Sequence, residues 1–116
     1  MLLLAVILFA SAALGGAFMA IRILTNKNAP LAVALLHGGA GAAGLLTLLL
    51  AVLSLDEFGA AGLALTIFGA NALLGFYLFS CHLRRRPWPK AAVLIHGAAA
   101  VTAFAILLFA LLKASG

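Results

Sequence analysis

Residues 30–38 read PLAVALLHG, and 59 positions later residues 89–97 read PKAAVLIHG. Each stretch opens an apolar run with a proline. A histidine follows seven residues later, about two helical turns on, and a glycine comes directly after it. Proline suits the first turn of a helix, because the N–H that it lacks would have no partner there. Both stretches therefore predict a helix with a histidine about 10 Å from its start, at a rise of about 1.5 Å per residue.

The same shift of 59 positions relates most of the chain to itself. It aligns residues 4–53 with residues 63–112 and gives 17 identities in 50 positions, where a chain so rich in leucine and alanine would give roughly 7 by chance. The matched residues include Phe9 with Phe68 and Gly16 with Gly75. We interpret the chain as one domain, residues 1–116, made of two duplicated helix hairpins.

The composition indicates a membrane as the surroundings of these helices. The chain is 67% hydrophobic and 8% charged, whereas about a quarter of the residues of a soluble domain are charged. Residues 2–23, 30–53, 58–83 and 89–112 are each apolar over the roughly 20 residues that a spanning helix needs. Short loops force neighbouring helices to be antiparallel. The predicted fold class is all-α, an integral membrane four-helix bundle, with a rough two-fold axis along the membrane normal.

Charged residues lie almost entirely in the loops. The formal net charge is +5, and the first and third loops with their flanking residues hold six of the seven bases: Arg22, Lys27, Arg84, Arg85, Arg86 and Lys90. The second loop holds both acids. Basic loops face the cytoplasm, which predicts a bacterial inner-membrane protein with both termini on the non-cytoplasmic side. Short clusters between apolar runs do not resemble a nucleic-acid-binding face, so no nucleic-acid partner is expected.

The paired histidines predict a cofactor site. Helices that begin at Pro30 and Pro89 run in the same direction, so His37 and His96 could face each other across the two-fold axis. Small residues follow each histidine, most of them on its helix face, and are expected to leave a slot for a flat macrocycle: Gly38, Gly41, Gly44, Gly97, Ala100 and Ala103. Haem iron takes two axial imidazoles. We therefore predict haem b with His37 and His96 as metal ligands.

Basic residues near the same membrane surface are expected to hold the haem propionates: Arg22, Lys27, Arg84, Arg85 and Arg86. This layout resembles, in architecture alone, the four-helix b-type cytochromes of membranes. The resemblance implies a small haem protein that exchanges electrons with a quinone or with a membrane redox partner. Two other functions stay open, namely a cofactor-free structural or assembly subunit of a larger complex, and a small channel or transporter acting as a homo-oligomer.

Other polar and small residues have more ordinary interpretations. His82 matches Ile23 in the repeat and is expected at the interface, in contact with lipid, a propionate or a quinone head group. Asn71 matches Ala12 and is expected to hydrogen-bond across a helix pair, with a quinone carbonyl as the alternative partner. Small residues of the first and third helices are expected at close helix contacts: Ser11, Gly15, Gly16, Gly69 and Gly75.

Several function classes find no support in the sequence. No acid lies inside an apolar segment, so the carboxylate of a proton-coupled four-helix exporter is missing. The chain has no HExxH, GxSxG, phosphate-binding loop or Cys–His dyad. A hydrolase or ATPase is therefore not expected, and whether the chain is an enzyme stays open.

Overall fold

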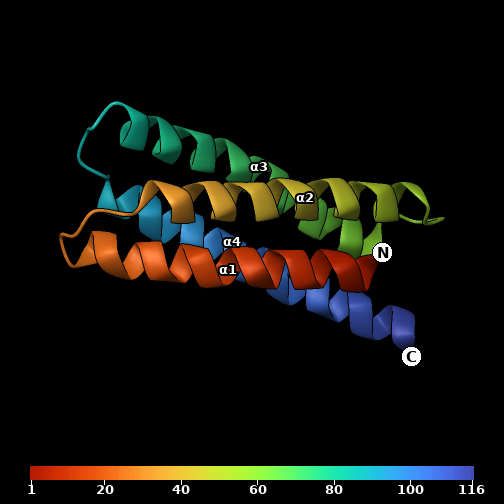
Figure 1. The fold of residues 1–116 in the computed structure, drawn as a ribbon. Coiled ribbons are helices and arrows are strands. Elements are labelled where there is room, and N and C mark those ends of the chain that lie inside the picture. Colours follow the sequence, from red (N-terminus) through yellow and green to blue (C-terminus); the bar gives the residue numbers. More distant parts are fainter.

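The computed structural model describes residues 1–116 as four antiparallel helices. They are α1 (Leu2–Leu24), α2 (Leu31–Leu53), α3 (Gly59–Leu83) and α4 (Lys90–Ser115). These bounds confirm the four predicted segments, with α4 running three residues beyond its predicted end. Both termini and the α2–α3 loop lie at one end of the molecule, and the other two loops lie at the opposite end (Figure 1).

Prolines precede α2 and α4, and positive-φ residues follow α1 and α3. Pro30 and Pro89 are extended, and their carbonyls accept the first helical hydrogen bonds of α2 and α4. At the far end of each hairpin's first helix, Asn26 and Arg85 have positive φ, 61° and 53°. The next amide in each loop bonds to the carbonyl five positions back, which completes a Schellman cap. The two loops therefore share the same cap conformation, and Asn26 and Arg85 are 59 positions apart.

The four helices form a closed ring of neighbours. α1 packs against α2 and α4, and α3 packs against α4 and α2. Across the two diagonals, α1 to α3 and α2 to α4, all Cα atoms stay more than 8 Å apart. The bundle is 44 Å long and 19 Å wide, and 44 Å is close to the 40–45 Å of a bilayer with its head groups. Side chains therefore fill the space along the bundle axis.

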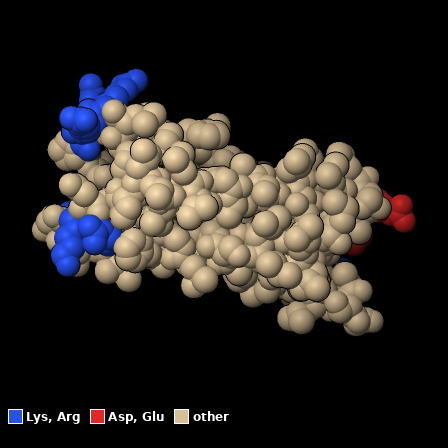
Figure 2. Space-filling view, viewed as in Figure 1, with Lys and Arg blue, Asp and Glu red and all other residues tan.

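The outer surface is apolar between its two ends. Only 22 of 116 residues are buried, and large side chains such as Leu14, Leu36 and Phe76 are at least 70% exposed. All four helices are long and apolar enough to span a membrane. Lysines and arginines gather at the end with the two basic loops, and the acids lie at the opposite end (Figure 2). Lys113 at that acidic end approaches Glu57 to 4.0 Å in the one ion pair of the chain.

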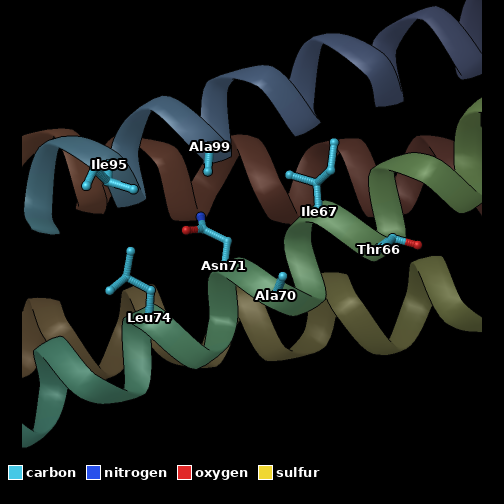
Figure 3. A pocket seen from close by; sticks show the side chains of 7 residues that line it. All are labelled: Thr66, Ile67, Ala70, Asn71, Leu74, Ile95 and Ala99. Carbon is cyan, nitrogen blue, oxygen red and sulfur yellow. The ribbon is translucent and has the colours of Figure 1, made fainter.

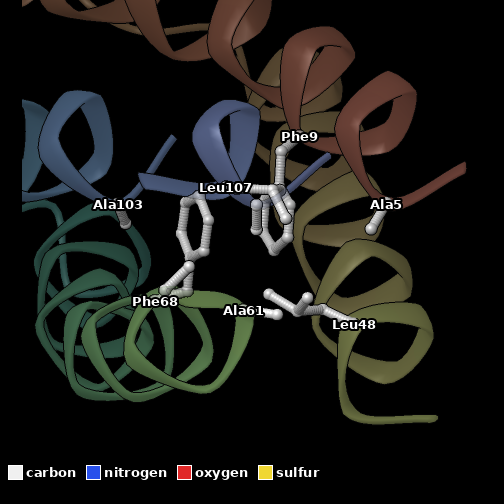
Figure 4. Packing of buried hydrophobic residues seen from close by; sticks show 9 residues of the cluster. Ala5, Phe9, Leu48, Ala61, Phe68, Ala103 and Leu107 are labelled. Carbon is white, nitrogen blue, oxygen red and sulfur yellow. The ribbon is translucent and has the colours of Figure 1, made fainter. Parts of the chain in front are cut away.

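Two hydrophobic clusters fill the interior. The terminal cluster, toward the chain ends, contains Ala5, Phe9, Leu48, Ala61, Ala64, Phe68, Ala103, Leu107 and Ala110, and Figure 4 shows how their side chains pack. In it, the rings of Phe9 and Phe68 stack with centroids 3.7 Å apart. The loop cluster lies toward the basic loops and contains Met19, Ile23, Ala29, Ala34, Leu78 and Val93.

Burial follows the spacing of 59 positions found in the sequence. Most buried residues come in pairs at that spacing: Ala5 and Ala64, Phe9 and Phe68, Ala12 and Asn71, Met19 and Leu78, Ala34 and Val93, Gly44 and Ala103, Leu48 and Leu107, Ala51 and Ala110. Members of these pairs are not always of the same type, as Ala12 and Asn71 illustrate. Equivalent positions in the two hairpins therefore face the interior whether or not their side chains agree.

Candidate functional site

A polar layer separates the two hydrophobic clusters. Along every helix, its members fall between residues of the terminal cluster and residues of the loop cluster. The polar layer consists of Ala12 and Gly16 on α1, His37 on α2, Asn71 and Gly75 on α3, and His96 on α4. Both histidines of the predicted site belong to it. Imidazoles at this level are surrounded by apolar side chains above and below.

His37 is held by the neighbouring helix of its own hairpin. Its Nδ1 lies 2.7 Å from the backbone oxygen of Ala12. Because a carbonyl oxygen only accepts, Nδ1 must carry the proton and donate it. A Cβ atom on Gly16 would lie 2.9 Å from the Cε1 atom of His37, and one on Gly15 would lie 3.5 Å from its Cβ. Glycine at position 16 therefore provides the space that this imidazole occupies.

His96 occupies the equivalent place in the second hairpin, with a different polar contact. A Cβ atom on Gly75 would lie 3.1 Å from the Cε1 atom of His96. The Nδ2 group of Asn71 donates a hydrogen bond of 3.0 Å to the backbone oxygen of His96. This bond joins α3 to α4, which confirms the predicted role of Asn71 across a helix pair. Two buried atoms of this pair, Asn71 Oδ1 and His96 Nδ1, have no hydrogen-bond partner.

The two imidazoles meet across the α2–α4 diagonal. Their ring centroids lie 6.1 Å apart, and the ring planes are inclined by 74°. No group of three or more histidine, cysteine, aspartate or glutamate side chains exists to hold a metal ion. A structural zinc ion, which takes four protein ligands, does not match this donor set. Two imidazoles could hold an iron that takes its remaining ligands from a macrocycle.

The small residues predicted to line a slot differ in their surroundings. Gly38, Gly41 and Gly97 have open space where a Cβ would project. Gly44 packs against the Phe9 ring at 3.1 Å, and Ala103 is fully buried in the terminal cluster; Ala100 is half-buried. The small residues that border the imidazoles are Gly16 and Gly75, on the neighbouring helices. The 59-residue shift matches these two glycines, which was the signal available in the sequence.

The basic residues predicted to hold propionates lie at the loop end of the bundle, beyond the loop cluster. Lys27, Arg84, Arg85 and Arg86 are exposed, and no acid pairs with them. The half-buried Arg22 donates from Nε to the backbone oxygen of Asn28 at 2.6 Å. These cations face outward from the end of the bundle, so they are free to bind an anionic group that reaches the same end.

His82 lies outside the polar layer. Its ring sits 5.4 Å from that of Trp88 and 6.2 Å from that of Phe79, measured between centroids. All three residues are near the basic loops, at the ends of their segments. His82 therefore belongs to an aromatic group at the loop end and not to the pair of histidines inside the bundle.

A shallow groove of about 350 Å³ runs between α3 and α4 beside this layer (Figure 3). Its lining is apolar except for Thr66 and Asn71. The Thr66 hydroxyl is already bonded to the carbonyl of Gly62 at 3.0 Å, and Asn71 Oδ1 is not accessible from outside. The groove therefore offers an approaching molecule little beyond apolar contact.

Comparison of the chain with protein-family models, curated proteins and solved structures finds no match.

Proposed function

We propose that this chain is a membrane-spanning protein of two duplicated hairpins that binds one haem b between His37 and His96. It would exchange electrons with a quinone or with a membrane redox partner. The observation that carries the proposal is the pair of imidazoles, brought from diagonal helices to a centroid separation of 6.1 Å inside an apolar bundle. Ionisable side chains inside a membrane are functional more often than structural.

His37 and His96 would hold the iron of the haem. The two imidazoles, with centroids 6.1 Å apart, would therefore hold the iron from α2 and α4.

The hydrogen bond of His37 leaves the correct nitrogen for a metal. When Nδ1–H donates to a carbonyl, Nε2 carries the lone pair, which is how most metal-bound histidines are oriented. Ala12 supplies this carbonyl from a helix backbone, which cannot turn away. Gly16 and Gly75 allow α1 and α3 to approach the two rings closely. The haem, when bound, supplies a one-electron couple at its iron.

The charges at the loop end support the same proposal. Propionates buried at the membrane centre would be expensive, so they should lie toward a surface. Lys27 and the three arginines of residues 84–86 offer cations at the end nearer the histidines, which lie two turns inside α2 and α4. Charge-assisted bonds from arginine to carboxylate are among the stronger protein hydrogen bonds.

Membrane insertion and duplication are parts of the proposal with their own support. The apolar outer surface and the separation of basic and acidic ends favour a bilayer, with the basic loops cytoplasmic and both termini on the other side. Equal burial at positions 59 apart and the shared conformation of the two basic loops favour duplication. A bacterial inner membrane is the proposed location.

A second candidate, a subunit without cofactor, has one observation in its favour. Each imidazole already packs against a glycine, and His37 has a hydrogen bond of 2.7 Å. Histidines in this setting could join helices without binding anything.

The haem content of the purified protein distinguishes the two candidates. After expression with ample haem, extraction of the pigment should give one haem per chain, and the protein should show a Soret band. A colourless protein that fails to take up added haem would refute the haem proposal and leave the subunit without cofactor.

A further inference from the structure

Asn71 stands at the one place where the two hairpins treat their histidines differently. It is 8% exposed, and its equivalent in the first hairpin is Ala12. At that position the first hairpin uses a backbone carbonyl to accept from Nδ1 of His37. Position 71 has the equivalent backbone carbonyl, but no hydrogen bond joins it to Nδ1 of His96. The second hairpin adds a side-chain amide at this position, bonded to the backbone oxygen of His96.

The two atoms left without partners are chemically complementary. Asn71 Oδ1 only accepts hydrogen bonds, whereas His96 Nδ1 donates when it is protonated. Both are buried, and they belong to residues already joined by a hydrogen bond. Buried polar atoms without partners are rare, and each requires an explanation. Pairing Oδ1 with Nδ1–H would satisfy both atoms.

We propose that Asn71 is the positioning residue of the second histidine, which it holds through an Nδ1–H to Oδ1 hydrogen bond with Nε2 unprotonated. The proposal rests on the haem function, because it concerns how the second axial ligand is kept ready. This hydrogen bond would keep the proton of His96 on Nδ1, as the Ala12 carbonyl does for His37. Other side-chain acceptors are scarce at this level, since the polar layer holds no acid and, apart from His37, its remaining side chains are alanine and glycine. The rival acceptor is the backbone oxygen of Asn71, which makes no hydrogen bond to the His96 ring.

The test measures the tautomer of each histidine in haem-free protein. Protein labelled with ¹⁵N in histidine shows by NMR which ring nitrogen carries the proton. Signals are assigned from the variants His37→Ala, His96→Ala and His82→Ala. We expect Nδ1–H for both His37 and His96 in the native chain. In Asn71→Leu, which keeps a similar shape without an acceptor, the Nδ1–H signal of His96 should be lost, while that of His37 remains.

Two further variants keep the outcome decisive. Asn71→Ala should act like Asn71→Leu and should fold, because alanine already occupies the equivalent position 12. Thr66→Val, which removes a hydroxyl from α3 away from the histidines, should change neither tautomer. If His96 keeps Nδ1–H in both Asn71 variants, the backbone and not the side chain holds it, and the proposal is overturned.

A second measurement separates this inference from the haem proposal. In haem-loaded protein, loss of a ligand-orienting bond should weaken haem affinity by about 10- to 100-fold and raise the midpoint potential, because the imidazole donates less charge to iron. An unchanged affinity and potential in both Asn71 variants would overturn the positioning role. If the native chain takes up no haem but His96 loses Nδ1–H in the variants, the haem proposal fails and the contact between Asn71 and His96 stands.

Discussion

Replacing Gly16 with alanine tests whether glycine is needed beside the His37 imidazole. The added methyl carbon would lie 2.9 Å from Cε1 of that ring, against the roughly 3.5–4.0 Å at which carbon atoms attract each other. The ring would therefore have to move by about 0.6 Å or more, against its hydrogen bond to Ala12. Overpacking of this kind typically costs about 1–3 kcal/mol.

Gly69→Ala is the matched control, because nothing lies within 4 Å of where its Cβ would project. Both substitutions gain about 0.5–1 kcal/mol from the lower flexibility of alanine in a helix, and this gain cancels when the two variants are compared. We therefore expect the free energy of unfolding of Gly16→Ala to be about 1–3 kcal/mol lower than that of Gly69→Ala. Gly75→Ala, with its slightly longer distance of 3.1 Å to His96, should fall between them.

The assay is reversible unfolding in mixed micelles, followed through the fluorescence of Trp88, the single tryptophan of the chain. A His37→Ala background removes the ring and should abolish the difference between Gly16→Ala and Gly69→Ala. Equal stability of these two variants in the native background would show that the imidazole does not need the space at Gly16.

Three more predictions concern the loops, the core and the orientation. Arg85→Gly should stabilise the protein by up to about 1 kcal/mol, because it removes a side chain from a left-handed backbone conformation. Arg84→Gly, at negative φ, should not stabilise it, and equal shifts of the two variants in thermal unfolding would contradict the reasoning. A double-mutant cycle with leucine at Phe9 and Phe68 should give a coupling of about 0.5–1.5 kcal/mol for their stacked rings, and strictly additive losses would count against the stack. With Cys81 replaced by alanine, a cysteine at Leu55 should react with an impermeant reagent in intact cells, and protection there would reverse the proposed orientation.

The helices could be predicted closely because their causes are local. Apolar length and the prolines at positions 30 and 89 determine where α2 and α4 begin, and both start one residue later in the structure. The buried pair Phe9 and Phe68 also follows from the repeat, since identical residues at equivalent positions tend to share an environment.

The surroundings of the histidines could be predicted only in part. Spacing along a helix identified the residues on the same face as His37, but it does not show which neighbouring helix that face meets. Gly16 on α1 therefore could not be identified from the α2 sequence, although a Cβ there would lie 2.9 Å from the His37 ring, while nothing lies within 4 Å of a Cβ at Gly41. The contact from Asn71 to the His96 carbonyl depends on how α3 and α4 pack, which no single segment determines.

Iron ligation by His37 and His96 is tested most directly by the reduced-minus-oxidised absorption spectrum of the purified protein and three histidine variants. Two axial imidazoles should give a low-spin haem with a sharp α band in the native chain. The band should be lost in His37→Ala and in His96→Ala, and it should persist in His82→Ala, because His82 packs with Trp88 at the loop end. Loss of the band in His82→Ala, or its persistence in either of the other two variants, would contradict ligation by the paired histidines.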